Sequence, residues 1–361
     1  MKRILQVLPK LEMGGVENGT IDTAIILQKN SMVPFVASAG GKKIKELEEK
    51  NIQHFRLWLD SKNPIIIFFN SFILAIIIFL KRIDIVHARS RAPAWSAWLA
   101  CKMTGATFLT TFHGFYSGYD NCIKRQYNKV MTWGKKIITP SKFMKEHLKK
   151  YYKIDQERII PIYRGVITNR FINVNPKRII NLKQKYKIEN EKVVTLPGRL
   201  TDWKGQLVFL EAIQKVKLNN IKYLIIGNGS SKYKNQLLKI INDKNLDVII
   251  DSECNDIPAL YNLSDIIISA STSEETFGRV SVEGQSAGKV VLATSIGGSL
   301  ETIIDNKTGY FFEPFNSLKL AELIEMVIKN NINMKDEGKK NSQNFDISVF
   351  EKNILKVYNK I

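Results

Sequence analysis

The chain has 361 residues, a length that suits two domains better than one core, and its 44% hydrophobic and 24% charged residues exclude a disordered chain. Its net charge of +20 lies mostly in residues 1–170, which hold 28 Lys and Arg against 12 Asp and Glu, while the rest hold 26 against 22. A basic half indicates an anionic partner. Because no nucleic-acid motif accompanies it, we expect an acidic membrane surface or an anionic acceptor and no nucleic acid; a purely solubilising charge is the alternative.

The cysteines and the first residues indicate the compartment. Cys101, Cys122 and Cys254 are far apart and form no C-x-x-C pair, which favours reduced thiols in the cytoplasm and argues against a zinc site. The apolar run after Met1 ends at Pro9, so we expect a first strand there rather than a signal peptide.

The first half alternates apolar strands with helical patterns. We expect strands at residues 2–8, 33–38, 83–86, 107–111, 136–140 and 158–163, and helices at 16–28, 44–50 and 142–150. Gly14 and Gly15 stand between the first strand and its helix. Such a glycine pair can seat a phosphate or let an acceptor approach the backbone, and a tight turn explains it equally well.

The most hydrophobic run is Pro64–Leu80. It is slightly short of the roughly 20 residues that a bilayer span needs, and Asn70 and Ser71 interrupt it. A spanning helix would also place the strands of one sheet on opposite sides of a membrane. We therefore expect a buried core helix, with a helix lying in the membrane interface beside Lys81 and Arg82 as the second choice.

Two loops of the first half carry candidate ligand groups. Arg89 and Arg91 follow the strand at 83–86, and guanidinium groups match phosphates and carboxylates, so they are candidates for an anionic acceptor or for donor phosphates. An ordinary basic surface loop is the alternative. His113 follows the strand at 107–111 beside a glycine, where it is either a cleft residue or a core histidine.

The polar, lysine-rich stretch at 169–190 predicts the linker, and strands are expected at 192–196, 223–226 and 248–250 before a last helix at 348–360. Gly198, Arg199 and Lys204 follow the first of these strands. Gly227, Asn228 and Gly229 follow the second, and we expect them near a nucleotide. No D-x-D occurs in the sequence, so two cations, Arg199 and Lys204, would have to neutralise a leaving diphosphate.

The stretch 265–298 predicts a strand, a polar turn, a helix from Gly278 and a further strand. Glu275 lies in the turn and Glu283 in the helix. Carboxylates suit the hydroxyls of sugars, and a helix N-terminus suits phosphate, so the segment could hold a nucleotide sugar. A solvated helix face with two unrelated acids is the alternative.

The same segment, Glu275-Thr276-Phe277-Gly278 followed by Glu283, resembles the E-x7-E motif of the retaining glycosyltransferases of family 4. The resemblance extends in order over nearly the whole chain, through the segments 14–17, 198–205, 297–301 and 306–310. The sequence departs from the family pattern at Ile250-Asp251-Ser252, at 284–287 and at Ile167. The first departure leaves the nucleobase open.

The resemblance implies an α/β protein of GT-B fold, with two Rossmann-like domains that face each other across a cleft. It places the acceptor-side domain at 1–170, the nucleotide-sugar domain at 171–345, and a C-terminal helix at 346–361 that returns to the first domain. The implied reaction is metal-independent transfer, with retention, of a hexose-type sugar from a nucleoside-diphosphate sugar. The implied acceptor is a glycolipid or lipid-linked saccharide of lipopolysaccharide, O-antigen or capsule synthesis, reached at the inner face of the cytoplasmic membrane.

The resemblance also implies roles for individual residues of this chain. Arg199 and Lys204 would stabilise the diphosphate, Glu275 would hold donor-sugar hydroxyls, Glu283 the ribose, and His113 would lie near the reacting carbon. No metal or other cofactor is expected. The expected donor-binding residues are Gly14, Gly15, Gly198, Gly227, Asn228, Gly229, Thr276, Phe277, Gly278, Arg279 and Glu283. A nucleotide-sugar 2-epimerase of the same fold and a non-catalytic membrane-associated partner are the alternatives.

Overall fold

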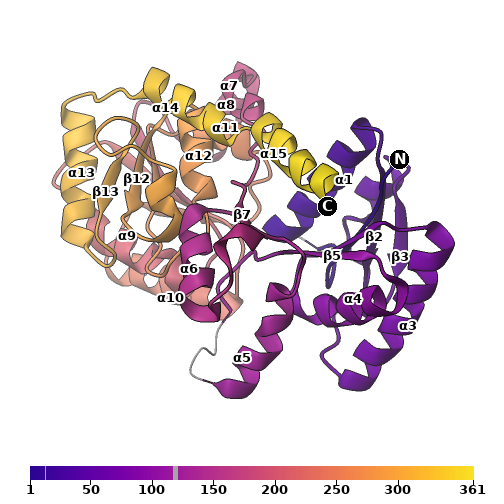
Figure 1. Cartoon of the computed structure of the whole chain (residues 1–361). Helices are drawn as coiled ribbons and strands as arrows, with labels where there is room; N and C mark the ends of the chain where they lie inside the picture. Colours follow the sequence, from indigo (N-terminus) through magenta and orange to yellow (C-terminus); the bar gives the residue numbers. More distant parts are fainter. Residues whose placement is uncertain (13, 117–120) are drawn as a thin grey trace. The chain divides into compact units, whose positions relative to one another are not determined.

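The computed structural model describes residues 1–12, 14–116 and 121–361, and the chain divides into two compact units (Figure 1). Unit 1 comprises Met1–Arg164 together with Phe350–Ile361, and unit 2 comprises Gly165–Val349. Each unit has its own parallel sheet, covering helices and apolar core.

Unit 1 is built on a seven-stranded sheet in the order β3-β2-β1-β4-β5-β6-β7, in which each strand runs parallel to its neighbours. The strands are β1 (Arg3–Val7), β2 (Val33–Ser38), β3 (Gln53–Arg56), β4 (Ile85–Ala88), β5 (Thr107–Thr111), β6 (Ile137–Thr139) and β7 (Ile159–Pro161). The central strands are apolar and buried, as a parallel sheet with helices on both faces requires. The strand order reverses between β1 and β4, so a ligand site is expected at their carboxyl ends.

Helices connect these strands. They are α1 (Gly15–Lys29), α2 (Ile44–Glu48), α3 (Pro64–Lys81), α4 (Arg91–Thr104), α5 (Cys122–Asn128) and α6 (Lys142–Tyr152), with 3-10 turns η1 (Lys129–Thr132) and η2 (Gln156–Arg158). Helix α4 packs on β1, β4 and β5, and α3 packs on α4. Asn63 starts α3, because its side chain accepts the Ile65 N–H at 2.9 Å and Pro64 occupies the first helical position.

The expectation that residues 64–80 form a buried core helix is wrong. Of the 18 residues of α3, five are buried: Ile67, Asn70, Ser71, Leu74 and Ile78. The helix is long and apolar enough to cross a membrane by composition, with a mean hydropathy of 2.3. However, β3 and β4, which precede and follow it, belong to one sheet. The helix therefore lies on the outside of unit 1, with eight of its 18 residues exposed and five partly buried.

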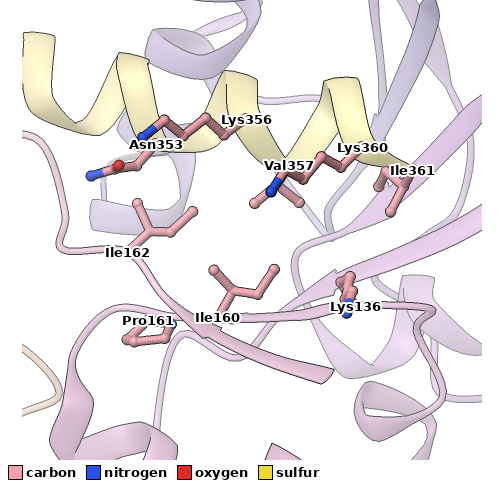
Figure 2. Close-up of a pocket in the computed structure, with 9 residues that line it drawn as sticks. All are labelled: Lys136, Ile160, Pro161, Ile162, Asn353, Lys356, Val357, Lys360 and Ile361. Carbon is pink, nitrogen blue, oxygen red and sulfur yellow. The ribbon is translucent and has the colours of Figure 1, made fainter. Parts of the chain in front are cut away.

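The C-terminal helix α15 (Ile347–Lys360) enters unit 1 from Phe350 onward. The Tyr358 hydroxyl lies 2.6 Å from Nδ1 of the buried His87, and Lys2 donates to the Tyr358 carbonyl at 2.7 Å. Figure 2 shows the cavity between α15 and β7, of about 350 Å³, where Val357 lies over Ile160 and lysines stand at the rim. These contacts fix the end of the chain on unit 1, against the central strand β4, the residue before β1 and the edge strand β7.

Unit 2 has a six-stranded parallel sheet in the order β10-β9-β8-β11-β12-β13. The strands are β8 (Lys192–Pro197), β9 (Ile221–Ile226), β10 (Val248–Asp251), β11 (Ile266–Ser269), β12 (Val290–Thr294) and β13 (Tyr310–Phe312). The order reverses between β8 and β11, which makes the carboxyl ends of these two strands the switch point of this sheet.

The helices of unit 2 are α7 (Asn169–Ile172), α8 (Pro176–Lys185), α9 (Gln206–Ile213), α10 (Ser231–Asp243), α11 (Ile257–Leu263), α12 (Arg279–Ser286), α13 (Ser317–Lys329) and α14 (Lys335–Ser342), with 3-10 turns η3 (Asp202–Lys204), η4 (Gly297–Glu301) and η5 (Gln343–Phe345). The stretch 169–190, predicted as a linker, instead carries α7 and α8, and both pack on α11. The ion pair between Arg178 and Asp256 joins α8 to the start of α11.

Candidate active site

The switch point of unit 2 brings together two of the predicted site residues. Lys204 ends the 3-10 turn after β8, and Glu275 lies in the loop after β11. The Lys204 Nζ atom lies 2.6 Å from Glu275 Oε1, and the two side chains are only 17% and 12% exposed. The Ser271 hydroxyl donates to the same carboxylate oxygen. The predicted cation and the predicted sugar-binding carboxylate therefore form one cluster.

Backbone contacts hold the two loops in register independently of this ion pair. The Thr272 N–H donates to the Trp203 carbonyl at 2.8 Å. Gly205 has a φ of +76°, and a side chain there would collide with the carbonyl of Ala270. Only glycine lets the β8 loop lie so close to the end of β11. The Lys204 Nζ atom also lies 4.5 Å from the centre of the Trp203 ring, which confines the ammonium further.

The loop after β12 packs against the backbone of Glu275. The Gly298 N–H donates to the Glu275 carbonyl at 2.7 Å. A Cβ atom at Gly297, whose φ is +62°, would lie 2.5 Å from that same carbonyl oxygen. The glycine pair at 297–298, which the sequence ties to the family pattern, therefore allows two backbone segments to pack face to face.

Glu275 is followed by the start of α12. Thr276 is partly buried, and Phe277 is 3% exposed and packs edge-on against Phe345, with ring centres 5.7 Å apart. Gly278 takes a φ of +104° as the residue before the helix. The positive end of the α12 dipole lies here, directly after the Glu275 loop, and favours an anion.

Glu283 lies inside α12 and is 8% exposed. Its Oε1 accepts from Arg279 Nε at 2.6 Å, and its Oε2 accepts from the Tyr261 hydroxyl at 3.1 Å. Burial, and then the Glu283 carboxylate, raises the pKa of Tyr261 well above its ordinary value, so this phenol stays a donor. The predicted residues Arg279 and Glu283 are thus joined. Tyr261 was not predicted, because it lies in an ordinary apolar helix pattern 22 residues before Glu283.

The loops after β8 and β9 pack against each other. The Leu200 N–H donates to the Asn228 carbonyl at 2.9 Å, and side chains at Gly227 or Gly229 would collide with the carbonyls of Gly198 and Leu200. The expected nucleotide-binding residues 198 and 227–229 therefore form one edge of the switch point. The Arg199 carbonyl accepts from Gln206 at 3.0 Å. Its side chain is exposed, in contrast to the largely buried Lys204.

In unit 1, His113 lies at the carboxyl end of β5. Its Nδ1 atom is 3.0 Å from Arg164 Nη2. A guanidinium can only donate, so Nδ1 accepts and the ring proton lies on Nε2. Burial first, and then the charge of Arg164, lowers the pKa of His113 well below its ordinary value, which keeps the ring neutral.

Arg164 also connects His113 to the glycine pair. A side chain at Gly15 would collide with Arg164 Nη1, and one at Gly14 would collide with the Glu17 carboxylate. Arg164 was not among the site residues predicted from the sequence. Its position just after β7 was the available signal, because the other unit 1 candidates also follow strands.

The two predicted acceptor arginines differ. Arg89 is 3% exposed, and its guanidinium donates to Gln6 Oε1 at 3.1 Å and to Thr23 Oγ1 at 2.7 Å. It is not part of an exposed basic loop. Arg91 is partly exposed, donates to Asn128 Oδ1 at 3.0 Å, and lies 4.3 Å from the centre of the Tyr116 ring.

Comparison with known proteins identifies the family. Residues 13–170 match the sequence-family model described as Glycosyltransferase Family 4, and residues 178–345 match that of Glycosyl transferases group 1. The crystal structure of a glycosyltransferase from Rickettsia africae ESF-5 is 39% identical, covers 99% of this chain and 98% of its own, and superposes with a TM-score of 0.92. The chain belongs to the family 4 glycosyltransferases. The family and the GT-B fold expected from the sequence are confirmed.

Two further relatives of this glycosyltransferase are informative. The lipopolysaccharide 1,2-N-acetylglucosaminetransferase of Salmonella typhimurium is 32% identical over 197 residues, which span 50% of each chain. Anabaena Alr3699/HepE in complex with UDP-glucose covers 100% of both chains with a TM-score of 0.87, at 21% identity. The second likeness is one of fold. Together the comparisons establish an enzyme that transfers sugar from a nucleotide-sugar donor.

Proposed function

We propose that this glycosyltransferase moves a hexose-type sugar, with retention and without a metal ion, from a nucleoside-diphosphate sugar to a glycolipid or lipid-linked saccharide. The acceptor belongs to the synthesis of a cell-envelope polysaccharide such as lipopolysaccharide, O-antigen or capsule. The observation that carries the donor half of this proposal is the Lys204–Glu275 pair at the switch point, beside the N-terminus of α12.

The pair supports a division of roles between its two members. When the donor binds, hydroxyls of its sugar donate hydrogen bonds to the Glu275 carboxylate. The Lys204 ammonium then pairs with the diphosphate instead of with Glu275. Arg199 and the α12 dipole add to the stabilisation of the charge that develops on the leaving diphosphate. Glu283, already oriented by Tyr261 and Arg279, holds the ribose hydroxyls.

The remaining roles follow from unit 1. His113 contacts the donor sugar near the reacting carbon as a neutral ring, and Arg164 fixes which nitrogen carries the proton. Gly14 and Gly15 form the backbone surface of the site next to His113. Front-face transfer with retention needs no protein nucleophile, so Glu275 acts here by holding the sugar.

The donor and acceptor classes rest on the relatives and on charge. UDP-glucose is the first donor to test, because HepE binds it within the same fold. A lipid-linked or glycolipid acceptor is supported by the lipopolysaccharide transferase of Salmonella and by the basic first half of the chain.

The test is a thermal-shift panel of UDP, GDP, ADP and their hexose derivatives, followed by product analysis with lipid extracts as acceptors. A nucleotide at about a hundred times its dissociation constant adds about 2.7 kcal/mol to the free energy of unfolding. We expect one base to stabilise the protein selectively, and activity to survive a chelator. Strict dependence on a divalent cation would refute the metal-independent route. Formation of a new nucleotide sugar without acceptor would establish the epimerase instead.

A further inference from the structure

The outward face of α3 is an exposed apolar surface. Its large side chains recur every three or four residues, which places them on one side of the helix. Phe79 is 79% exposed, Ile65 76% and Phe69 65%. We call this surface the α3 face, and it consists of Ile65, Phe68, Phe69, Phe72, Ile76, Phe79 and Leu80.

The polarity of α3 is the reverse of that in an ordinary surface helix. Two of its polar residues, Asn70 and Ser71, are buried, whereas its phenylalanines are exposed. Asn70 Nδ2 donates to the Trp58 carbonyl at 2.9 Å, and Ser71 donates to the Phe68 carbonyl at 2.5 Å. A helix on the surface of a water-soluble protein normally turns its polar side to solvent. The α3 face is therefore suited to contact with another apolar environment rather than with bulk water.

Neighbouring elements extend this surface. Trp58, in the segment before α3, is 70% exposed, and Met103 on α4 is 48% exposed. Phe79, Leu80 and Met103 line a hollow of about 810 Å³ together with Arg82. The exposed apolar side chains thus come from two helices and one loop, and Arg82 and Asp84 lie at the edge of the hollow.

The charges close to α3 are mostly positive, and the nearest acids are Asp60 before the helix and Asp84 after it. Residues 61–83 contain no Asp or Glu, and they hold Lys62 before the helix and Lys81 and Arg82 at its end. Lys102 follows on α4, close to Met103. Apolar and aromatic side chains flanked by cations are the composition that inserts into the interface of a bilayer with anionic headgroups.

The helix cannot span that bilayer. Its inward face is fixed on α4, where Ser96 donates to the Ile67 carbonyl at 3.0 Å, and the strands before and after it lie in one sheet. Its 18 residues have a length of about 27 Å, enough for a helix that lies flat on the membrane.

We propose that the α3 face docks in the plane of an anionic phospholipid bilayer, with the phenylalanines among the acyl chains and the lysines at the headgroups. The chain is then a peripheral membrane protein. This inference rests on the proposed function in one respect: docking presents unit 1 to a lipid-linked acceptor. The occupant is a lipid surface because the cations at both ends complement anionic headgroups.

The experiment is co-sedimentation of the full chain with vesicles of phosphatidylcholine alone or with 30 mol% phosphatidylglycerol. We expect binding to the anionic vesicles that weakens steeply as salt rises. The double variant Phe69→Glu/Phe79→Glu should lower the partition coefficient at least tenfold, and Lys62→Gln/Lys81→Gln should remove most of the salt dependence. The matched control, Phe315→Glu/Leu318→Glu, changes two exposed apolar side chains of unit 2 and should bind as the unchanged protein does.

The same preparations separate this inference from the proposed function. Thermal stabilisation by UDP should be equal in all variants, since none of these residues lies in the donor site. Equal vesicle binding by the unchanged protein and Phe69→Glu/Phe79→Glu would overturn the docking inference. So would a lipid-free dimer that this variant dissociates, because the α3 face would then be an interface between two copies. Loss of the UDP response with vesicle binding retained would count against the proposed donor and leave the docking inference supported.

Discussion

Lys204 Nζ lies 2.6 Å from Glu275 Oε1, and this contact joins the loop after β8 to the loop after β11 at the point where the strand order of unit 2 reverses. The backbone bond from Thr272 to Trp203 and the close approach at Gly205 fix the same two loops without using either charge. The ion pair is therefore free to exchange partners when a donor arrives, while the loops stay in place.

Replacing Glu275 by Gln tests whether the ion pair serves the reaction while backbone contacts hold the loops. The amide keeps the shape of the side chain but loses the charge that orients Lys204, so kcat/KM should fall by about 100-fold or more. The thermal midpoint should change little, because backbone bonds hold the loop. The matched control is Glu274→Gln, an exposed acid one residue earlier, which should leave turnover unchanged. Near-normal turnover of Glu275→Gln would remove this residue from the site.

Gly205→Ala tests the packing that supports the pair. Gly205 and Gly105 both have positive φ, +76° and +79°, but a Cβ at Gly205 collides with the Ala270 carbonyl whereas one at Gly105 meets open space. The left-handed conformation alone costs about 1–2 kcal/mol, which Gly105→Ala should show in urea unfolding. Gly205→Ala should lose at least about 3 kcal/mol, and it should lose activity as well. Equal losses in the two variants would mean that the β8 loop can move away from β11.

The sequence predicts these loops well, because each follows an apolar strand and carries glycines or charges in a recognisable order. It does not predict which partner each charge finds. Glu283 meets Tyr261 across 22 residues, and His113 meets Arg164 across 51, and such pairings depend on how helices and strands pack. The spacing of residues along the sequence therefore does not predict these pairings.

Helix α3 shows a second limit. Its run of Ile and Phe is apolar all round, so its periodicity gives no sign of which side is buried, and hydrophobicity alone predicts the core. The two interrupting residues, Asn70 and Ser71, were the available signal. Their burial reveals that the helix turns its polar side inward and its aromatic side out.

Tyr261→Phe tests the support of Glu283. Removing the phenol takes one donor from a carboxylate that is 8% exposed, while Arg279 continues to neutralise it. If Glu283 holds the ribose, the affinity for the nucleotide should fall by about 1 kcal/mol, seen as a roughly fivefold rise in the dissociation constant of UDP with kcat little changed. Tyr310→Phe, in β13, is the control. An unchanged dissociation constant in Tyr261→Phe would show that the phenol does not orient the ribose-binding group.

Acidification should destabilise the protein through its histidines. Burial, and second a neighbouring cation, lowers the pKa of all four: His54 beside Arg56, His87 beside Arg89, His113 beside Arg164 and His147 beside Lys150. The unfolded chain takes up protons on these rings near pH 6.5, where the folded chain does not. The unfolded state therefore binds more protons, and the free energy of unfolding falls as the pH drops below about 6.5.

His147 makes this pH dependence measurable in a single variant. Its pKa in the folded chain is lowered to about 4, so its share of the stability is lost between about pH 6.5 and pH 4. One proton corresponds to about 1.4 kcal/mol per pH unit, and solvent screening of this partly buried ring reduces that figure. Urea unfolding between pH 7.5 and 4.5 should therefore give a shallower slope for His147→Gln than for the unchanged protein. A free energy of unfolding that rises on acidification to pH 5.5 would contradict the argument, because it would require the folded imidazoles to bind the additional protons.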